Sequence, residues 1–311
     1  EADEAAILVQ FLVAFGNCVG ASPHFNVERD RHGVNEFVGV VGDTAKGRKG
    51  TSWGHIRETF RTIDEQWTIE RIKNGLSSGE GIIWQVRDPV NETDEAPKDK
   101  RLLALTSELA SVLAAMKRDS NTLSAVLRQS WDSETLAIMT KNFPARATNT
   151  HISMICHITL EELKKRMAET EAFNGFANRF IWILARRSKL LPEGGSMDSV
   201  DMSDVHRRLY QSVNFSRAAR RLQRDEEARK IWRAVYPQLS EAKPGLLGAI
   251  LSRSEAHVTR LSCIYALLDS STLVRKEHLL AALAVWVYAQ ASASYIFGNR
   301  MIDDVENRIH E

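Results

Sequence analysis

The chain has 311 residues, with 41 Lys and Arg against 40 Asp and Glu, 43% hydrophobic residues and 26% charged residues. These values are typical of a globular protein of about two domains, and they exclude a disordered, collagen-like or globally cationic chain. The net charge of +1 still permits nucleic-acid binding, because a local basic surface survives acidic residues elsewhere.

The cysteines and the apolar runs indicate in which cellular compartment the protein is expected and whether it associates with a membrane. Cys18, Cys156 and Cys263 lie far apart, so they predict neither a disulfide framework nor a metal site, and a reducing, cytoplasmic setting fits them best. The longest apolar runs fall short of the ~20 residues that cross a bilayer, so we expect no membrane partner. Because the sequence begins at Glu1 rather than Met and lacks a basic start, we expect a module of a longer polypeptide without a signal peptide.

The first half of the chain alternates between predicted helices and strands. Periodicity predicts a helix over residues 4–18, followed by strand-like runs at 24–29 and 35–41 with a hairpin turn between them at 30–33. Residues 88–100 are rich in Pro, Asp, Glu and Lys, which predicts a surface loop. The remaining predictions are helices over 53–74, 107–117 and 161–170, and strands over 81–86, 101–105, 150–158 and 180–185.

This alternation predicts an α/β core with a largely parallel sheet over residues 1–200. The Gly- and Pro-containing segment 191–196 is the expected boundary. Beyond it the strand signals end, so residues 201–311 are expected to form an all-helical C-terminal domain. Its predicted helices cover 203–211, 216–239, 252–269 and 276–297.

A Gly-rich basic loop joins a predicted strand to a predicted helix, which is the context of a P-loop. Backbone N–H groups and the helix N-terminus bind phosphate oxygens, a lysine neutralises their charge, and a hydroxyl binds Mg²⁺. Lys49 is the first choice for that lysine, Lys46 is the alternative, and Thr51 is the candidate Mg²⁺ ligand. Arg48 stands where Gly is usual, and a basic surface loop is the plainer interpretation. The candidate nucleotide-binding residues are Gly42, Asp43, Thr44, Ala45, Lys46, Gly47, Arg48, Lys49, Gly50, Thr51 and Ser52.

Two residues that follow predicted strands are candidates for catalysis. Glu108 could orient the water that attacks ATP, or it could be a first-turn helix carboxylate favoured by the helix dipole. His157 stands where RecA-type ATPases carry a γ-phosphate sensor, and an imidazole there is neutral near pH 7. A satisfied core histidine is the competing interpretation of His157.

Several arginines are candidates for stabilising the transferring phosphoryl group. Arg179, just before a predicted strand, is the first choice for an arginine finger, with Arg186 and Arg187 as competitors and a structural ion pair as the plain alternative. Arg253 and Arg260 share one polar face of a predicted helix. That face could present an arginine to the nucleotide, as a helical lid does, or it could simply be solvated.

A run of basic residues near the start of the helical region is the candidate DNA-binding surface. Arg217, Arg220, Arg221 and Arg224 have the spacing of one helix face, and residues 207–233 carry nine Lys or Arg against three acids. Such a stripe could follow the phosphate backbone of single-stranded DNA. A solvated helix face with ion pairs is the more ordinary interpretation.

Several motifs in order resemble those of a family of P-loop ATPases from phages, plasmids and mobile elements, a domain of unknown function. That family is similar to RecA/DnaB-type replicative helicases and is often joined to a primase-polymerase module. The resemblance covers about residues 30–290. The motifs are VGD at 41–43 with KGTS at 49–52, SSGEG at 77–81, TLS at 122–124 with WD at 131–132, HIS at 151–153 with HIT at 157–159, and NGFANRF at 174–180.

The resemblance implies a RecA/AAA+-like P-loop NTPase core followed by a helical, lid-like domain. It assigns the phosphate and Mg²⁺ roles to Lys49 and Thr51, the catalytic carboxylate to Glu108, the sensor to His157 and the finger to Arg179. It also implies ATP hydrolysis, single-stranded DNA as a partner, a homo-oligomeric ring for which a hexamer is one candidate, and an associated primase or replication module.

Three functional hypotheses follow. The first is the ATPase motor of a replicative or mobile-element DNA helicase. The second is a nucleotide-binding regulatory or scaffold module of a replication or defence protein with little ATP turnover, favoured by the relaxed loop and the single acid Glu108. The third is a small-molecule P-loop kinase, suggested by Lys49-Gly50-Thr51.

Overall fold

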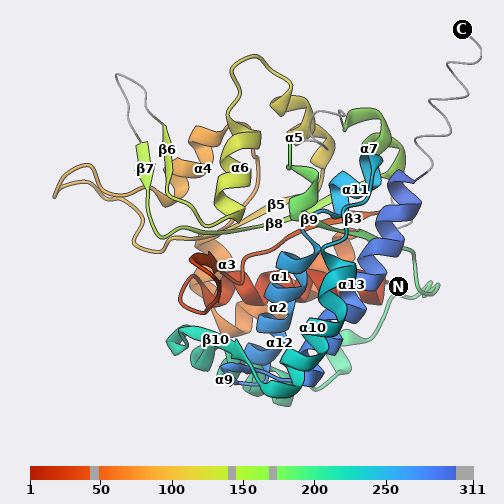
Figure 1. Ribbon diagram of the computed structural model, residues 1–311. Coiled ribbons are helices and arrows are strands. Elements are labelled where there is room, and N and C mark those ends of the chain that lie inside the picture. The colour runs from red at the N-terminus through yellow and green to blue at the C-terminus, as the bar shows by residue number, and fades with distance from the viewer. Residues whose placement is uncertain (43–48, 139–144, 168–173, 299–311) are drawn as a thin grey trace, which may run out of the picture.

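A five-stranded parallel sheet forms the centre of the protein (Figure 1). The computed structural model describes residues 1–42, 49–138, 145–167 and 174–298. Strands buried on both faces are continuous apolar runs, such as Phe-Ile-Trp-Ile-Leu at 180–184, so the predicted α/β class with a parallel sheet is confirmed. The strand order is β4 (Ile72–Lys73), β5 (Arg101–Thr106), β8 (His151–Ile158), β3 (Phe37–Val41) and β9 (Phe180–Leu184).

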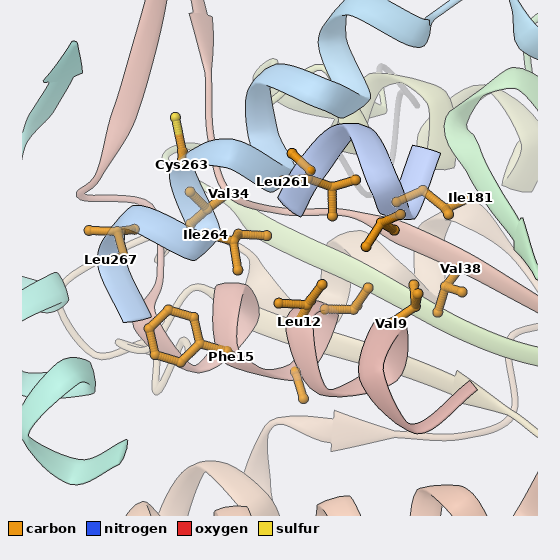
Figure 2. Close-up of a cluster of buried hydrophobic side chains, with 14 of the residues drawn as sticks. Val9, Leu12, Phe15, Val34, Val38, Ile181, Leu261, Cys263, Ile264 and Leu267 are labelled. Atoms are coloured by element: carbon orange, nitrogen blue, oxygen red, sulfur yellow. The ribbon is translucent and has the colours of Figure 1, made fainter. Parts of the chain in front are cut away.

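One face of the sheet packs against the first helices and against later ones. Side chains of a strand alternate between faces, and Val38 and Val40 of β3 point into this layer. Figure 2 shows Leu12 and Phe15 beside Leu261 and further side chains of the same late helix. The helices that contribute to this layer are α1 (Glu4–Val19), α2 (Lys49–Ile63), α3 (Glu65–Glu70), α9 (Ser203–Ala218), α12 (Ser254–Leu268) and the first part of α13 (Lys276–Phe297).

The opposite face carries a second apolar cluster, to which Phe37 and Val41 of β3 contribute. The strand predicted over 81–86 is wrong, because these residues belong to helix α4. Ser78 caps that helix by accepting a hydrogen bond from the Gly81 N–H at 3.1 Å. The helices on this face are α4 (Gly79–Val86), α5 (Leu109–Met116), α6 (Leu123–Trp131), α7 (Leu160–Arg166) and α11 (Gly245–Leu251).

Helix α13 runs along β9 at the edge of the sheet and contributes to both apolar clusters (Figure 1). It has 22 residues and a mean hydropathy of 1.5 in its most apolar window, so its length and composition alone would allow it to span a membrane. Its buried side chains, among them Trp286 and Phe297, pack inside the protein. We therefore describe α13 as a core helix of a globular protein.

A smaller sheet lies beside the first layer, and it corrects two predictions. The strand that pairs with β1 across the predicted turn is β2, whereas residues 37–41 belong to the central sheet. The helix predicted over 216–239 is interrupted, and the predicted absence of strands beyond residue 200 is wrong. The elements are β11 (Leu273–Val274), β10 (Arg221–Arg224), β1 (His24–Val27), β2 (Asp30–His32) and α10 (Glu226–Leu239); β6 (Leu136–Ile138) and β7 (Ala145–Ala147) form a separate hairpin, and η2 (Ala177–Arg179) and η3 (Met197–Ser199) are short 3₁₀ turns.

The chain on either side of residue 200 shares one hydrophobic core. The first cluster joins Val38 and Ile181 of the central sheet to Val213, Leu261 and Val285 of later helices. Strand β10 also pairs with β1 in parallel. The expected boundary falls in an exposed segment, but the segments that it separates are packed together rather than joined by a linker alone.

Candidate functional site

The carboxyl ends of the central strands gather the P-loop candidates at one edge of the sheet. The strand register pairs Val41 with Ile158 on one side and with Leu184 on the other. Thr106 pairs with Cys156, so Glu108 comes two residues later, close to the level of Ile158. Loops at the carboxyl edge of a parallel sheet are where α/β proteins bind their ligands.

Lys49 is the first residue of α2 and reaches back to the end of β3. Its Nζ donates a hydrogen bond to the Gly42 carbonyl oxygen at 2.8 Å. Gly42 itself lies so close to β9 that an added Cβ would stand 2.6 Å from the Ala185 carbonyl oxygen. The loop residues between these two, Asp43, Thr44, Ala45, Lys46, Gly47 and Arg48, lie outside the described residues, as does the alternative that Lys46 is the phosphate lysine.

The first turn of α2 exposes Gly50 and Thr51 and buries Ser52. The Ser52 hydroxyl donates to the Lys49 carbonyl oxygen at 2.6 Å. Thr51 is therefore the exposed hydroxyl-bearing residue of this turn, and its use as a Mg²⁺ ligand stays a prediction.

A buried chain of hydrogen bonds connects this turn to the end of β8. Gln10 of α1 donates from Nε2 to Ser52 Oγ at 2.7 Å and to the Ala6 carbonyl oxygen at 2.9 Å. Its Oε1 then faces His157 Nε2 at 2.9 Å. Because an amide oxygen only accepts, His157 must carry its proton on Nε2. The first turn of α2, α1 and β8 are thus coupled through three side chains.

His157 is a neutral histidine in this environment. Burial, reinforced by the positive charge of Lys49, lowers the pKa of His157 from 6.5 to about 4. A neutral, buried and hydrogen-bonded imidazole fits both the sensor interpretation of His157 and the competing interpretation as a core histidine. The bond goes to Gln10, a residue that the sequence reasoning did not single out, although it is the polar break in an apolar helix.

Glu108 is the N-cap of α5, and its carboxylate makes no capping hydrogen bond with that helix. The side chain is exposed at the carboxyl edge. Strand β8 lies between β5 and β3, so the strand that precedes Glu108 is not a direct neighbour of β3. It nevertheless stands at the same edge as Lys49.

Arg179 lies at the opposite edge of the sheet, because it precedes β9 and β9 runs parallel to β3. Its guanidinium forms an ion pair with Asp132 and donates to the Gly175 carbonyl oxygen, and the residue is 7% exposed. Arg253 binds the other oxygen of Asp132 at 3.1 Å. Both side chains are held at the amino edge by one carboxylate, so the lid role of Arg253 does not fit this placement. The finger role of Arg179, which is expected to act at the site of a neighbouring subunit, stays a prediction.

Arg260 also departs from its predicted role. It is 2% exposed, and its guanidinium donates to the carbonyl oxygens of Asn35 and Trp131, at the amino end of β3. One helical turn away, His257 binds Glu36 Oε2 through Nδ1 at 2.9 Å and the Asn178 carbonyl through Nε2. The polar face of α12 is therefore neither solvated nor directed at a nucleotide; it is buried against the amino edge.

The alternatives to Arg179 are better placed. Arg186 and Arg187 follow β9 directly, next to Gly42 at the carboxyl edge. Arg187 forms an ion pair with Glu1, whereas the Arg186 side chain is exposed and lies 5.9 Å from the Tyr295 ring centroid. Both arginines therefore lie at this edge of their own chain, and Arg186 is the one of the two that is exposed.

The single basic stripe predicted for residues 217–224 is wrong, because α9 ends at Ala218 and β10 begins at Arg221. The alternating geometry of the strand sends neighbouring side chains to opposite faces. The four arginines therefore separate: Arg217 pairs with Asp64, Arg220 donates to carbonyl oxygens at the end of α9, Arg221 is exposed and Arg224 is buried.

Within the described residues, no three His, Cys, Asp or Glu side chains are clustered as a metal site. All three cysteines are buried and unpaired by disulfides. A divalent cation at the carboxyl edge would therefore need phosphate oxygens in addition to Thr51 or Glu108. The lysine, the helix N-terminus and the hydroxyl suit a Mg²⁺-bound triphosphate in that respect.

Comparison with known proteins leaves this site to be judged on its geometry. No protein-family model matches the chain, and no curated protein matches it significantly.

Proposed function

We propose that the protein binds ATP with Mg²⁺ at the carboxyl edge of the central sheet and hydrolyses it. The observation that carries this proposal is Lys49, which begins α2 directly after the Gly-rich loop and points its ammonium back to Gly42 at 2.8 Å. A lysine held at the base of such a loop is positioned to meet β- and γ-phosphate oxygens.

The sheet order supports the proposal. One strand, β8, separates β3 from β5, so the ends of these two strands stand roughly 10 Å apart, two interstrand spacings. That leaves room for a terminal phosphate and a water molecule between Lys49 and Glu108.

The residues of this chain would divide the work. Lys49 and the N–H groups at the start of α2 would bind phosphate oxygens, Thr51 would contribute a ligand to Mg²⁺, and Glu108 would orient the attacking water. Bound Mg²⁺ supplies charge neutralisation of the phosphate oxygens. His157 would report the occupancy of the site to α1 through Gln10, and Arg186 would add positive charge.

The biological role extends this proposal by resemblance. We propose a motor domain of a replicative or mobile-element DNA helicase, which acts in the cytoplasm as a homo-oligomeric ring on single-stranded DNA beside a primase or replication module. The resemblance in motif order over about residues 30–290 supports this role.

The decisive experiment compares Lys49→Ala with Lys117→Ala. Lys117 is an exposed lysine at the end of α5, away from the carboxyl edge, so its loss removes the same charge without touching the site. We expect Lys49→Ala, but not Lys117→Ala, to abolish ATP binding in calorimetric titration. We expect the same variant to abolish ATP turnover measured in the presence of oligo-dT. Equal binding by both variants would refute the P-loop assignment.

A regulatory module with little turnover is the second candidate. Gly50, which has no hydroxyl, follows Lys49, and Glu108 is the one acid that the sequence assigned to catalysis. Tight ATP binding by the wild type with no turnover, on or off DNA, would favour this candidate. Turnover lost in Glu108→Gln with ATP binding retained would favour the motor.

A further inference from the structure

A basic pocket outside the ATP site lies between β1, β10 and α10, and its volume is about 350 Å³. It lies in the segment that the sequence predicted as one basic helix and that instead forms strand β10 followed by helix α10. Six of the residues that line the pocket carry positive charge or aromatic rings: Arg221, Arg224, Arg229, Arg233, Phe25 and Trp232.

Arg224 is the buried cation of this pocket. It is 8% exposed and lies between two rings, with its guanidinium carbon 3.8 Å from the Trp232 centroid and 4.6 Å from the Phe25 centroid. Nη2 donates to Thr259 Oγ1 at 2.8 Å, whereas Nε is buried without a hydrogen-bond partner. Burial lowers the pKa of Arg224 to about 10, so the group remains a cation at neutral pH.

Three exposed arginines are also among the residues that line the pocket. Arg229 and Arg233 are four residues apart on α10 and therefore share one helix face, and Arg221 extends from β10. Arg229 lies 3.7 Å from Glu226 in an exposed ion pair, which is a weak restraint. No carboxylate is among the residues that line the pocket in the described part of the chain.

A second aromatic ring of α10 lies next to Trp232 of the pocket. Trp232 is partly exposed, and the Tyr236 ring lies 5.5 Å from it, one helical turn further on. Tyr236 is 47% exposed. Basic side chains beside partly exposed rings are the combination with which proteins hold single-stranded nucleic acid, since phosphates meet the charges and unpaired bases stack on the rings.

We propose that this pocket is a binding site for single-stranded DNA, in which a backbone phosphate meets the arginines and neighbouring bases stack on Trp232 and Tyr236. The choice of single-stranded DNA as the ligand rests on the proposed function, but binding of DNA in the pocket needs no ATP. A duplex binds less well, because its bases are already stacked and unavailable to the rings.

The test measures the anisotropy of fluorescein-labelled oligo-dT with the full chain, without nucleotide, over a range of salt concentrations. Arg229→Gln combined with Arg233→Gln removes two exposed charges that share one face of α10 at the pocket. We expect affinity to fall by about tenfold and the slope of log affinity against log salt to shrink by about 1.4, since each phosphate contact on a single strand contributes about 0.7. The matched control, Arg118→Gln with Arg207→Gln, removes two exposed arginines elsewhere and should change neither quantity.

The stacking contribution is tested with an abasic oligomer of equal length. The wild type should bind the abasic oligomer more weakly than oligo-dT. Tyr236→Leu should lower the affinity for oligo-dT and leave the affinity for the abasic oligomer unchanged. Absent binding of oligo-dT, or equal affinity of the pocket and control variants, would overturn the proposal. A wrong assignment of the ATP site would give a different result. ATP binding would then survive Lys49→Ala, while oligo-dT binding would still be weakened by the pocket substitutions.

Discussion

Gln10 joins three segments that are far apart in the chain. Its amide takes part in hydrogen bonds with Ser52 and His157, 42 and 147 residues away. The sequence shows Gln10 only as a break between two apolar runs, because helical periodicity reports which residues are buried and not which partners they meet. Local motifs nominate Lys49 and Glu108 as candidate site residues, whereas a link between distant segments exists only in the fold.

Replacing Gln10 with Leu tests this link. The change keeps side-chain size but leaves the Ser52 and His157 polar groups without their partner in a buried site, so we expect a loss of about 1–3 kcal/mol of unfolding free energy. Urea denaturation measures it. Gln66→Leu removes an exposed glutamine that binds Glu70 on the surface and should cost less than about 0.5 kcal/mol. Similar stabilities of the two variants would show that the buried link is unimportant.

Buried neutral histidines make the stability of the protein depend on pH. Burial lowers the pKa of both His151 and His157 from 6.5 to about 4. The unfolded chain therefore binds more protons between these values, so unfolding free energy falls as pH decreases from about 6.5 to about 4.

Denaturation at a series of pH values checks this dependence. His151→Gln should flatten the decline, with each pKa unit worth about 1.4 kcal/mol at most. His55→Gln replaces an exposed histidine of α2 and should leave it unchanged. A decline that is the same in His151→Gln and the wild type would contradict the assignment.

Helix α12 shows why a polar helix face need not lie in solvent. The spacing of Arg253, His257 and Arg260 predicts one shared face, and this face exists. Its environment could not be predicted, because Glu36 and Asp132, which balance its charge, lie more than 100 residues away. The short elements were ambiguous for another reason: an apolar run such as 82–86 fits a buried strand and a helix equally well.

Removing one charge from this face should be costly. Arg260→Met leaves the buried carboxylate of Glu36 with less compensating charge, so we expect about 3 kcal/mol or more of destabilisation in chemical denaturation. Adding Glu36→Gln to Arg260→Met should restore part of it. Arg207→Met on exposed α9 is the matched control and should change stability by no more than about 0.5 kcal/mol. Equal losses in both single variants would contradict the buried-charge account.

For the whole molecule, composition and alternation were sufficient for the α/β class but not for the packing of its parts. A boundary near residue 200 was expected because strand signals fade there and the loop is polar. The structure buries Leu261 and Val285 against side chains of the first 200 residues, and such long-range packing leaves no local signal.

Separating the two halves tests that shared core. We expect residues 1–200 alone to lack a cooperative thermal transition and to bind a hydrophobic dye, because the surface that α12 and α13 cover would be exposed. Co-expression with residues 201–311 should restore cooperative melting. A sharp transition in residues 1–200 alone would instead indicate an independently folding domain.

The position of α1 also has a consequence for protein synthesis. Val9, Leu12 and Phe15 are enclosed by Leu261 and Ile264 of α12, about 250 residues later in the chain (Figure 2). At a translation rate of about 5–20 residues per second, α1 waits roughly 10–50 s for this partner to leave the ribosome. An apolar helix without its cover for that long is a target for chaperones, so the apolar cluster that α1 shares with α12 can be completed only late in translation.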